Sequence, residues 1–112
     1  MTDYTPEAGD LVWLEFDPQA SLEQKGRRPG LVISPASYNQ KVGLMLCCPI
    51  ISKAKGYPFE VEVAAKEVSG VVLADQIKSL DWRARNAAPA GKAASEVLGR
   101  VRDMLRLLTE IS

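Results

Sequence analysis

The chain has 112 residues, of which 46% are hydrophobic and 25% charged, and its 14 basic and 14 acidic side chains leave no net charge. This length and composition are typical of one globular domain, which we expect to span residues 1–112. The balanced charge argues against a nonspecific nucleic-acid binder, and because the chain has no histidine, nucleophiles of the Ser-His-Asp and Cys-His types are excluded.

The first half of the chain alternates apolar strands with polar connections. Residues 11–16 predict a strand covered on both faces, because nearly every side chain there is apolar. The polar residues 17–29, which contain two prolines and a glycine, predict a long loop. Strands are predicted at 31–34 and 44–49, and residues 35–39 between them predict a turn or a single helical turn.

The second half continues this pattern. A second long loop is predicted at 50–58, followed by an alternating strand at 59–63 whose apolar side chains face inward and whose two glutamates face water. Residues 70–77 predict another strand that continues irregularly for a few residues. The small residues at 87–91, with a proline and a glycine, predict a connector.

An amphipathic helix is predicted near the C-terminal end, with Ser95 as its N-cap. Its apolar stripe, spaced by three and four residues, consists of Val97, Val101, Met104, Leu108 and Ile111. Such a stripe can cover an open sheet end or pair with a second copy of the chain. Short strands without helical crossovers imply antiparallel pairing. We therefore predict a mainly β domain with a C-terminal helix, built as a small, partly open antiparallel barrel.

The two cysteines, Cys47 and Cys48, are adjacent within a predicted strand. Neighbouring strand residues face opposite sides, so a disulfide between them would be strained, and we expect two buried thiols. The chain offers no zinc-ligand spacing, so we expect neither a metal nor another cofactor. No apolar run approaches the ~20 residues of a membrane span, and the first residues do not form a secretion signal; we expect a cytoplasmic protein.

Polar side chains gather at three strand ends or loops, in residues 23–28, 52–55 and 75–78. If the strands pair as predicted, these segments converge on one rim. A guanidinium stabilises a pentacoordinate phosphorane, a hydroxyl donates to a non-bridging oxygen, and a carboxylate takes the proton of a ribose 2′-hydroxyl. Together they suffice for metal-free RNA cleavage that leaves a 2′,3′-cyclic phosphate and a 5′-hydroxyl. DNA would bind but not react.

The candidates for this chemistry are Arg28, Ser52, and Asp75 or Glu23 as the base. Each has a simpler explanation: a solvated basic turn for Arg28, an ordinary loop hydroxyl for Ser52, and capping or solvated charge for the two carboxylates. Side chains in and beside the same segments are candidates for binding RNA. They are Gln24, Lys25, Arg27, Lys53, Lys55, Tyr57, Gln76 and Lys78.

Several ordered blocks occur together along the chain, including Gly9–Trp13, Arg28-Pro29, Lys55–Val61 and Gly70–Gln76. Through them the chain resembles, nearly end to end, the MazF/PemK (Kid) family of toxins, the mRNA interferases of type II toxin–antitoxin systems. The resemblance implies an SH3-like barrel of the MazF/CcdB kind, a homodimer, and sequence-specific, metal-independent cleavage of single-stranded RNA. It also implies an antitoxin whose disordered C-terminal tail occupies the RNA groove, with DNA contacted only through the antitoxin complex.

By resemblance, Arg28 matches the catalytic arginine of the family and Glu23 a loop glutamate important for activity in close relatives. Asp75 matches the aspartate proposed as the base in the Kid branch, but Leu73 stands where that branch has its arginine. The family usually carries a threonine after the third strand, where this chain has Ile51, followed by Ser52.

The departure at Ile51 leaves three interpretations: Ser52 replaces the threonine, the protein cuts slowly, or it has lost activity. The first makes the chain an active endoribonuclease. The last makes it a noncatalytic homologue that binds RNA or the antitoxin. Besides the active endoribonuclease and the noncatalytic homologue, a third hypothesis is that the chain poisons a protein target, as CcdB does, because a shared fold does not fix function.

Overall fold

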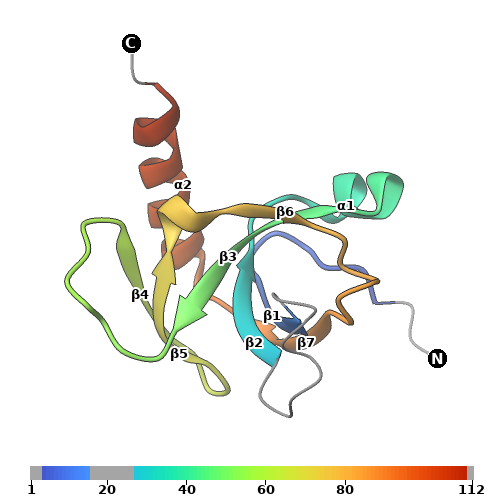
Figure 1. Ribbon diagram of the computed structural model, residues 1–112, viewed down its shortest axis with the longest axis horizontal. Coiled ribbons are helices and arrows are strands. Elements are labelled where there is room, and N and C mark those ends of the chain that lie inside the picture. The colour runs from blue at the N-terminus through green and yellow to red at the C-terminus, as the bar shows by residue number, and fades with distance from the viewer. Residues whose placement is uncertain (1–3, 16–26, 111–112) are drawn as a thin grey trace.

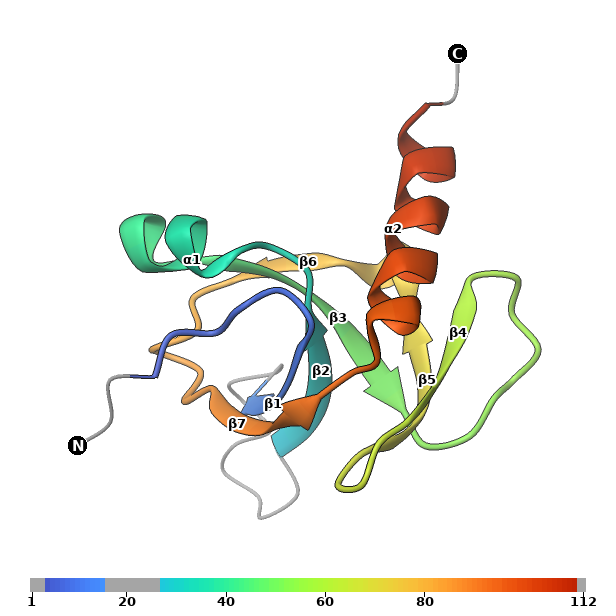
Figure 2. The same cartoon turned by 180° about the vertical axis from the view of Figure 1, so that it is seen from behind.

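The computed structural model describes residues 4–15 and 27–110, so the candidates Glu23, Gln24 and Lys25 lie outside the described residues. The described elements are arranged as Figures 1 and 2 show from opposite sides. They are β1 (Asp10–Glu15), β2 (Arg27–Val32), α1 (Ala36–Val42), β3 (Met45–Ile51), β4 (Glu60–Ala64), β5 (Ser69–Leu73), the 3₁₀ turn η2 (Ala74–Gln76), β6 (Lys78–Leu80), β7 (Ala88–Lys92) and α2 (Ser95–Thr109).

The strands form one strongly curved sheet in the order β4-β5-β3-β2-β1-β7, with β6 paired to β3. Every pairing is antiparallel. The first strand, β1, therefore lies beside the last, β7, although most of the chain separates them (Figure 1). This half-barrel with a C-terminal helix confirms the predicted fold class.

The core consists of two clusters of buried side chains on the two sides of the curved sheet. The larger is covered by α2, whose Val101 is fully buried there with Leu11, Val61 and Val72. The smaller gathers Val12, Leu14, Met45, Leu80 and Trp82. The apolar stripe of α2 thus covers the sheet, which was one of the two predicted alternatives. The rest of α2 extends beyond the sheet (Figure 2). The last stripe residue, Ile111, lies outside the described residues.

The helix cap is a correction. Ala94, not Ser95, precedes the first helical residue, and no side chain caps α2. Sequence placed the start of the helix one residue late, because a serine is a common capping residue whereas alanine offers no oxygen.

The predicted loop at 17–29 extends too far, because β2 already begins at Arg27. Arg27 and Arg28 pair with Glu15 and Leu14 of β1. Pro29 is compatible with a strand here since β2 pairs with β3 only from Gly30 onward, so its missing N–H costs no bond on that side.

Residues 88–92 form the strand β7 rather than a connector. β7 is an edge strand of the sheet, where a proline such as Pro89 is tolerated. A register shift between Leu11 and Val12 of β1 accommodates the irregular backbone, and Gly91 has a φ of 130° that side chains rarely adopt. The sequence missed β7 because its side chains are mostly small and form no clear strand pattern.

The predicted helical turn is a full helix, α1, anchored by the buried side chain of Asn39. The Asn39 amide nitrogen donates to the Pro6 carbonyl at 2.8 Å and the Ser34 carbonyl at 3.0 Å. Its backbone carbonyl accepts from the Trp82 indole at 2.9 Å. These bonds join three distant segments of the chain and fix Trp82 beneath α1.

Both cysteines are buried and free, as predicted. Burial, with the neighbouring Asp75 charge as a smaller cause, raises the pKa of the Cys48 thiol to about 12. Burial raises the pKa of Cys47 as well. Both thiols therefore stay protonated at neutral pH and act as small apolar side chains.

Candidate functional site

A cavity of ≈ 670 Å³ opens where the start of β2 meets the end of β3. We call it the Arg28 cavity. Its walls come from β1, β2, β3, the loop after β3 and the turn between β4 and β5. Its lining residues are Trp13, Arg28, Pro29, Ile50, Ile51, Ser52, Lys53, Lys55, Glu67, Val68 and Ser69.

Antiparallel pairing explains why Arg28 and Ser52 share this cavity. Gly30 of β2 lies opposite Pro49 of β3, so residues before Gly30 run alongside residues after Pro49. Ser52 is in the bend that directly follows β3 and is not a strand residue. The strict alternation of faces that separates neighbours in a strand therefore does not apply between Ile51 and Ser52, and both line the cavity.

The cavity is rich in positive charge. Arg28, Lys53 and Lys55 line it, against the single carboxylate of Glu67 among the described lining residues. Sequence reasoning overlooked Glu67, which lies in the hairpin turn between β4 and β5 and has no motif around it. Trp13 also lines the cavity, with its side chain 36% exposed. Such a cavity suits an anionic ligand with flat groups.

The third predicted segment does not reach this cavity. Asp75 and Gln76 are exposed on η2, and Lys78 on β6 pairs with Cys47 at the far end of β3 from Ile51. Those two positions on β3 are about 13 Å apart along a strand. The expected convergence of all three segments is therefore wrong: two of them meet, and Asp75, Gln76 and Lys78 lie elsewhere.

Arg27 has a different environment from its neighbour Arg28. Its guanidinium donates to the Trp13 carbonyl at 3.1 Å and the Asn86 carbonyl at 2.8 Å. It thus holds β1 against the segment that leads into β7. Tyr57, the remaining candidate, is 54% exposed on the loop after β3 and does not line the Arg28 cavity.

The loop that carries Lys53 and Lys55 is held by Glu60, the first residue of β4. One carboxylate oxygen accepts from the Lys55 N–H at 2.8 Å and the other from the Gly56 N–H at 3.3 Å. Gly56 has a φ of 83°, which suits glycine. Glu60 lies on the outward face of β4, as predicted, and it also closes the loop beside the cavity.

Replacing Glu60 with alanine should loosen this loop. Each lost charge-assisted bond is worth about 1.5–3 kcal/mol, so exchange of the Lys55 and Gly56 amide protons should accelerate by at least about tenfold in Glu60→Ala. Hydrogen exchange followed by NMR measures this. Glu62→Ala, on the same strand, is the control and should leave these amides unchanged. Equal exchange in wild type and Glu60→Ala would show that the carboxylate does not hold the loop.

Two negative findings concern the described part of the chain. Within residues 4–15 and 27–110, no three His, Cys, Asp or Glu side chains converge in a way that could hold a metal ion. Among the same residues, no helix is long and apolar enough to cross a membrane.

Comparison with known proteins places this geometry in a family. The family described as "PemK-like, MazF-like toxin of type II toxin-antitoxin system" matches residues 7–109. The chain is 48% identical over 105 residues to "Endoribonuclease toxin MazF" of Escherichia coli K12, covering 94% of this chain and 95% of that protein. It is 30% identical over 108 residues to "Endoribonuclease PemK" of Escherichia coli, covering 88% and 81%.

Solved structures agree with these sequence relatives. A MazE–MazF complex from Deinococcus radiodurans (Form II) matches with a TM-score of 0.86 and 53% identity, over 98% of this chain and all of that one. MazF alone from the same organism (Form I) matches with a TM-score of 0.86 and 57% identity. The half-barrel, the cavity between β2 and β3 and these matches along nearly the whole chain show that the protein belongs to the PemK-like, MazF-like toxins of type II toxin–antitoxin systems.

Proposed function

We propose that this chain is a sequence-specific, metal-independent endoribonuclease that cleaves single-stranded mRNA in the cytoplasm, with residues 1–112 forming one toxin domain. The single observation that carries the proposal is the meeting of Arg28 and Ser52, from distant parts of the sequence, in one cavity. The cationic lining supports RNA as the ligand. Single strands are favoured because their splayed bases expose the edges on which sequence specificity depends.

In the proposed reaction the ribose 2′-oxygen attacks the adjacent phosphorus while a carboxylate takes its proton. Arg28 donates to the non-bridging oxygens, where charge develops, and Ser52 donates a further hydrogen bond. The P–O5′ bond breaks, the 5′-oxygen takes a proton from water and leaves as a hydroxyl, and a 2′,3′-cyclic phosphate remains. Arg28 is not an ordinary base since its pKa exceeds ~12.

The carboxylate that acts as the base is proposed to be Glu23, on the family resemblance. Asp75 does not line the cavity, and Glu67 does, so Glu67 is the second candidate. Lys53 and Lys55 are proposed to bind flanking phosphates, together with Gln24 and Lys25 from the preceding loop.

Primer extension across a long RNA after incubation with the protein in EDTA tests this function. Discrete stops at one recurring sequence are expected. Intact RNA would contradict the proposal, and stalled DNA replication with intact RNA would favour a poison of a protein target.

Ser52 is proposed to supply the hydroxyl that the family usually places at the position of Ile51. Ser52→Ala should slow cleavage by about tenfold, the value of one hydrogen bond to a charged group. Ser79→Ala, on the distant strand β6, is the matched control and should cut normally. If the wild type leaves RNA intact in EDTA while Ile51→Thr cuts it, this chain is a noncatalytic homologue.

The same cavity is proposed to receive the disordered tail of a cognate antitoxin. The Deinococcus radiodurans relative is a MazE–MazF complex, and the cationic lining of the Arg28 cavity would attract acidic side chains. Because the antitoxin would then compete with RNA for one site, cleavage should fall as the antitoxin is added. Simultaneous binding of both would contradict this arrangement.

We also propose a homodimer. Tyr38 and Val42 lie one turn apart on α1 and are 40% and 49% exposed, and Leu46 on the following strand is 37% exposed. Apolar surface of this size at one place favours contact with a second copy. Light scattering should give twice the chain mass, and Val42→Glu should give the mass of one chain. A wild-type monomer at micromolar concentration would exclude this.

A further inference from the structure

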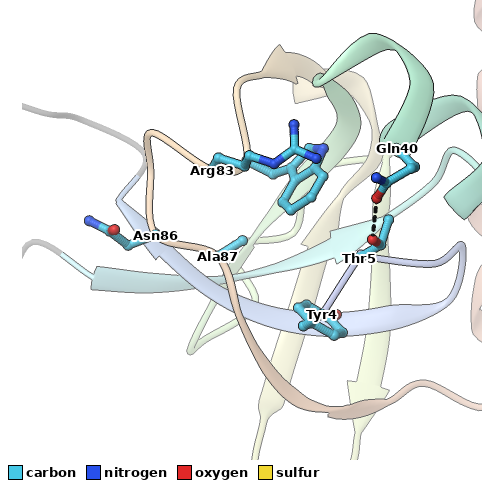
Figure 3. A pocket seen from close by; sticks show the side chains of 7 residues that line it. Tyr4, Thr5, Gln40, Arg83, Asn86 and Ala87 are labelled. Carbon is cyan, nitrogen blue, oxygen red and sulfur yellow. Dashed lines mark hydrogen bonds between the residues drawn. The ribbon is translucent and has the colours of Figure 1, made fainter. Parts of the chain in front are cut away.

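A second cavity, of ≈ 440 Å³, lies on the other side of the β1–β7 pair from the Arg28 cavity. We call it the Arg83 cavity, and Figure 3 shows it from close by. It is lined by Tyr4, Thr5, Gln40, Trp82, Arg83, Asn86 and Ala87. None of these described lining residues is acidic, so the Arg83 charge is not neutralised within the cavity.

The guanidinium of Arg83 forms a flat platform in this cavity. Its carbon lies 4.3 Å from the centre of the Trp82 ring, a cation–π contact. Trp82 itself is fixed by its indole bond to Asn39. Among the described residues Arg83 has no hydrogen-bond or ion-pair partner, so its N–H groups and its outer face remain available to a ligand.

Polar side chains lie near the Arg83 guanidinium, and hydrogen bonds to other residues hold Gln40 and Tyr4 in place. The Thr5 hydroxyl donates to the Gln40 side-chain oxygen at 2.6 Å, drawn as a dashed line in Figure 3, which leaves the amide N–H₂ of Gln40 as a donor. The Tyr4 hydroxyl donates to Asp10 at 2.7 Å. Asn86 uses its backbone carbonyl to bind Arg27, and its side-chain amide points away from Arg83 (Figure 3).

The two cavities lie on opposite sides of β1 and β7. Trp13, which lines the Arg28 cavity, lies opposite Ala88, and Ala87 lines the Arg83 cavity. Arg27 binds the carbonyls of both Trp13 and Asn86 and so fixes the distance between the two walls. A polymer that fills both cavities would therefore pass around β7, which is an edge strand of the sheet.

We infer that the Arg83 cavity binds a nucleotide of the RNA strand that flanks the cleaved step, with the base stacked on the Arg83 guanidinium and its edge read by the side-chain amide of Gln40. Bases commonly stack on arginine planes in single-stranded RNA recognition, and a phosphate beside Arg83 would neutralise its charge. This inference rests on the proposed function, because it assumes that RNA occupies the Arg28 cavity.

The chain offers a direct test because it has two tryptophans, one in each cavity. The probes are a trinucleotide and a nonanucleotide with a 2′-deoxy group at the cleaved step, so that neither is cut. In ¹H–¹⁵N spectra, the trinucleotide should shift the indole signal of Trp13 alone, and the nonanucleotide should shift those of Trp13 and Trp82. In Arg83→Met, which keeps the length of the side chain but removes its charge, the nonanucleotide should bind about five- to tenfold more weakly.

Several controls and outcomes separate this inference from the function on which it rests. Arg106→Met removes an exposed arginine of α2 that pairs with Asp103, and should bind both probes normally. Arg83→Met should cleave a three-nucleotide RNA at the wild-type rate. If the wild type cuts RNA but the nonanucleotide shifts only Trp13, or binds Arg83→Met with unchanged affinity, the inference alone is overturned. If neither probe binds the wild type, the proposed function and the inference fall together.

Discussion

Replacing Arg28 with alanine should reduce the rate of RNA cleavage by about 10²–10³-fold, the usual loss when one preorganised donor to a charged transition state is removed. Arg28 is exposed at the start of β2 and lines the cavity that also contains Ser52. The fold should therefore persist, and the melting temperature should change little. Single-turnover cleavage at saturating protein measures the chemical step apart from binding.

Arg28→Lys is the matched variant for this prediction. It keeps the positive charge but loses the planar, bidentate guanidinium, so it should bind RNA almost normally and still cut slowly. Arg106→Ala, which removes an equal charge on α2, should cut like the wild type. If Arg28→Ala weakens binding but leaves the single-turnover rate unchanged, Arg28 holds RNA and takes no part in the chemical step.

Replacing Gly70 with alanine should both destabilise the protein and disable the Arg28 cavity. Gly70 is the second residue of β5 and has a φ of 149°, and a Cβ there would lie 2.1 Å from the Ile51 carbonyl oxygen and 3.2 Å from the Ser52 Cα. Neither backbone atom can move without shifting the end of β3. We expect a loss of about 3 kcal/mol in the free energy of unfolding, from overpacking and backbone strain.

Two measurements distinguish the local and global effects of Gly70→Ala. Urea unfolding gives the stability, and cleavage assayed at a temperature where the variant is fully folded reports the displacement of Ser52, which should still slow the reaction. Gly99→Ala in α2 is the control, since no atom lies within 4 Å of its Cβ position. It should stabilise the helix by about 0.5–1 kcal/mol. Wild-type stability and cleavage in Gly70→Ala would refute the close approach.

The parts of the fold that sequence predicted well are those with strong apolar patterns. Residues 11–15, 45–49 and 60–63 form strands where their side chains indicate, and the stripe containing Val101 packs on the sheet. β7 was missed because Ala88–Lys92 has small side chains, a proline and a glycine, which resemble a connector, and its strand character comes from pairing with β1.

The candidate site was predictable only where the pairing of strands alone decides which residues meet. Arg28 and Ser52 flank ends of strands that pair, so antiparallel topology brings them together. Asp75 was misplaced because the register of β3 with β5 and β6, which sequence does not specify, puts η2 toward the opposite end of β3. Glu67 and the Arg83 cavity were invisible to the sequence because both depend on contacts between segments far apart in the chain.

The pairing of β1 with β7 has a consequence for synthesis on the ribosome. Trp13 finds its partner Ala88 only after most of the 112 residues have been translated, and closing a loop of that length carries an entropy cost. The nascent toxin therefore cannot complete its Arg28 cavity while the ribosome is still translating the middle of its messenger RNA. A cell that makes this protein receives the finished cleft only as the chain is released.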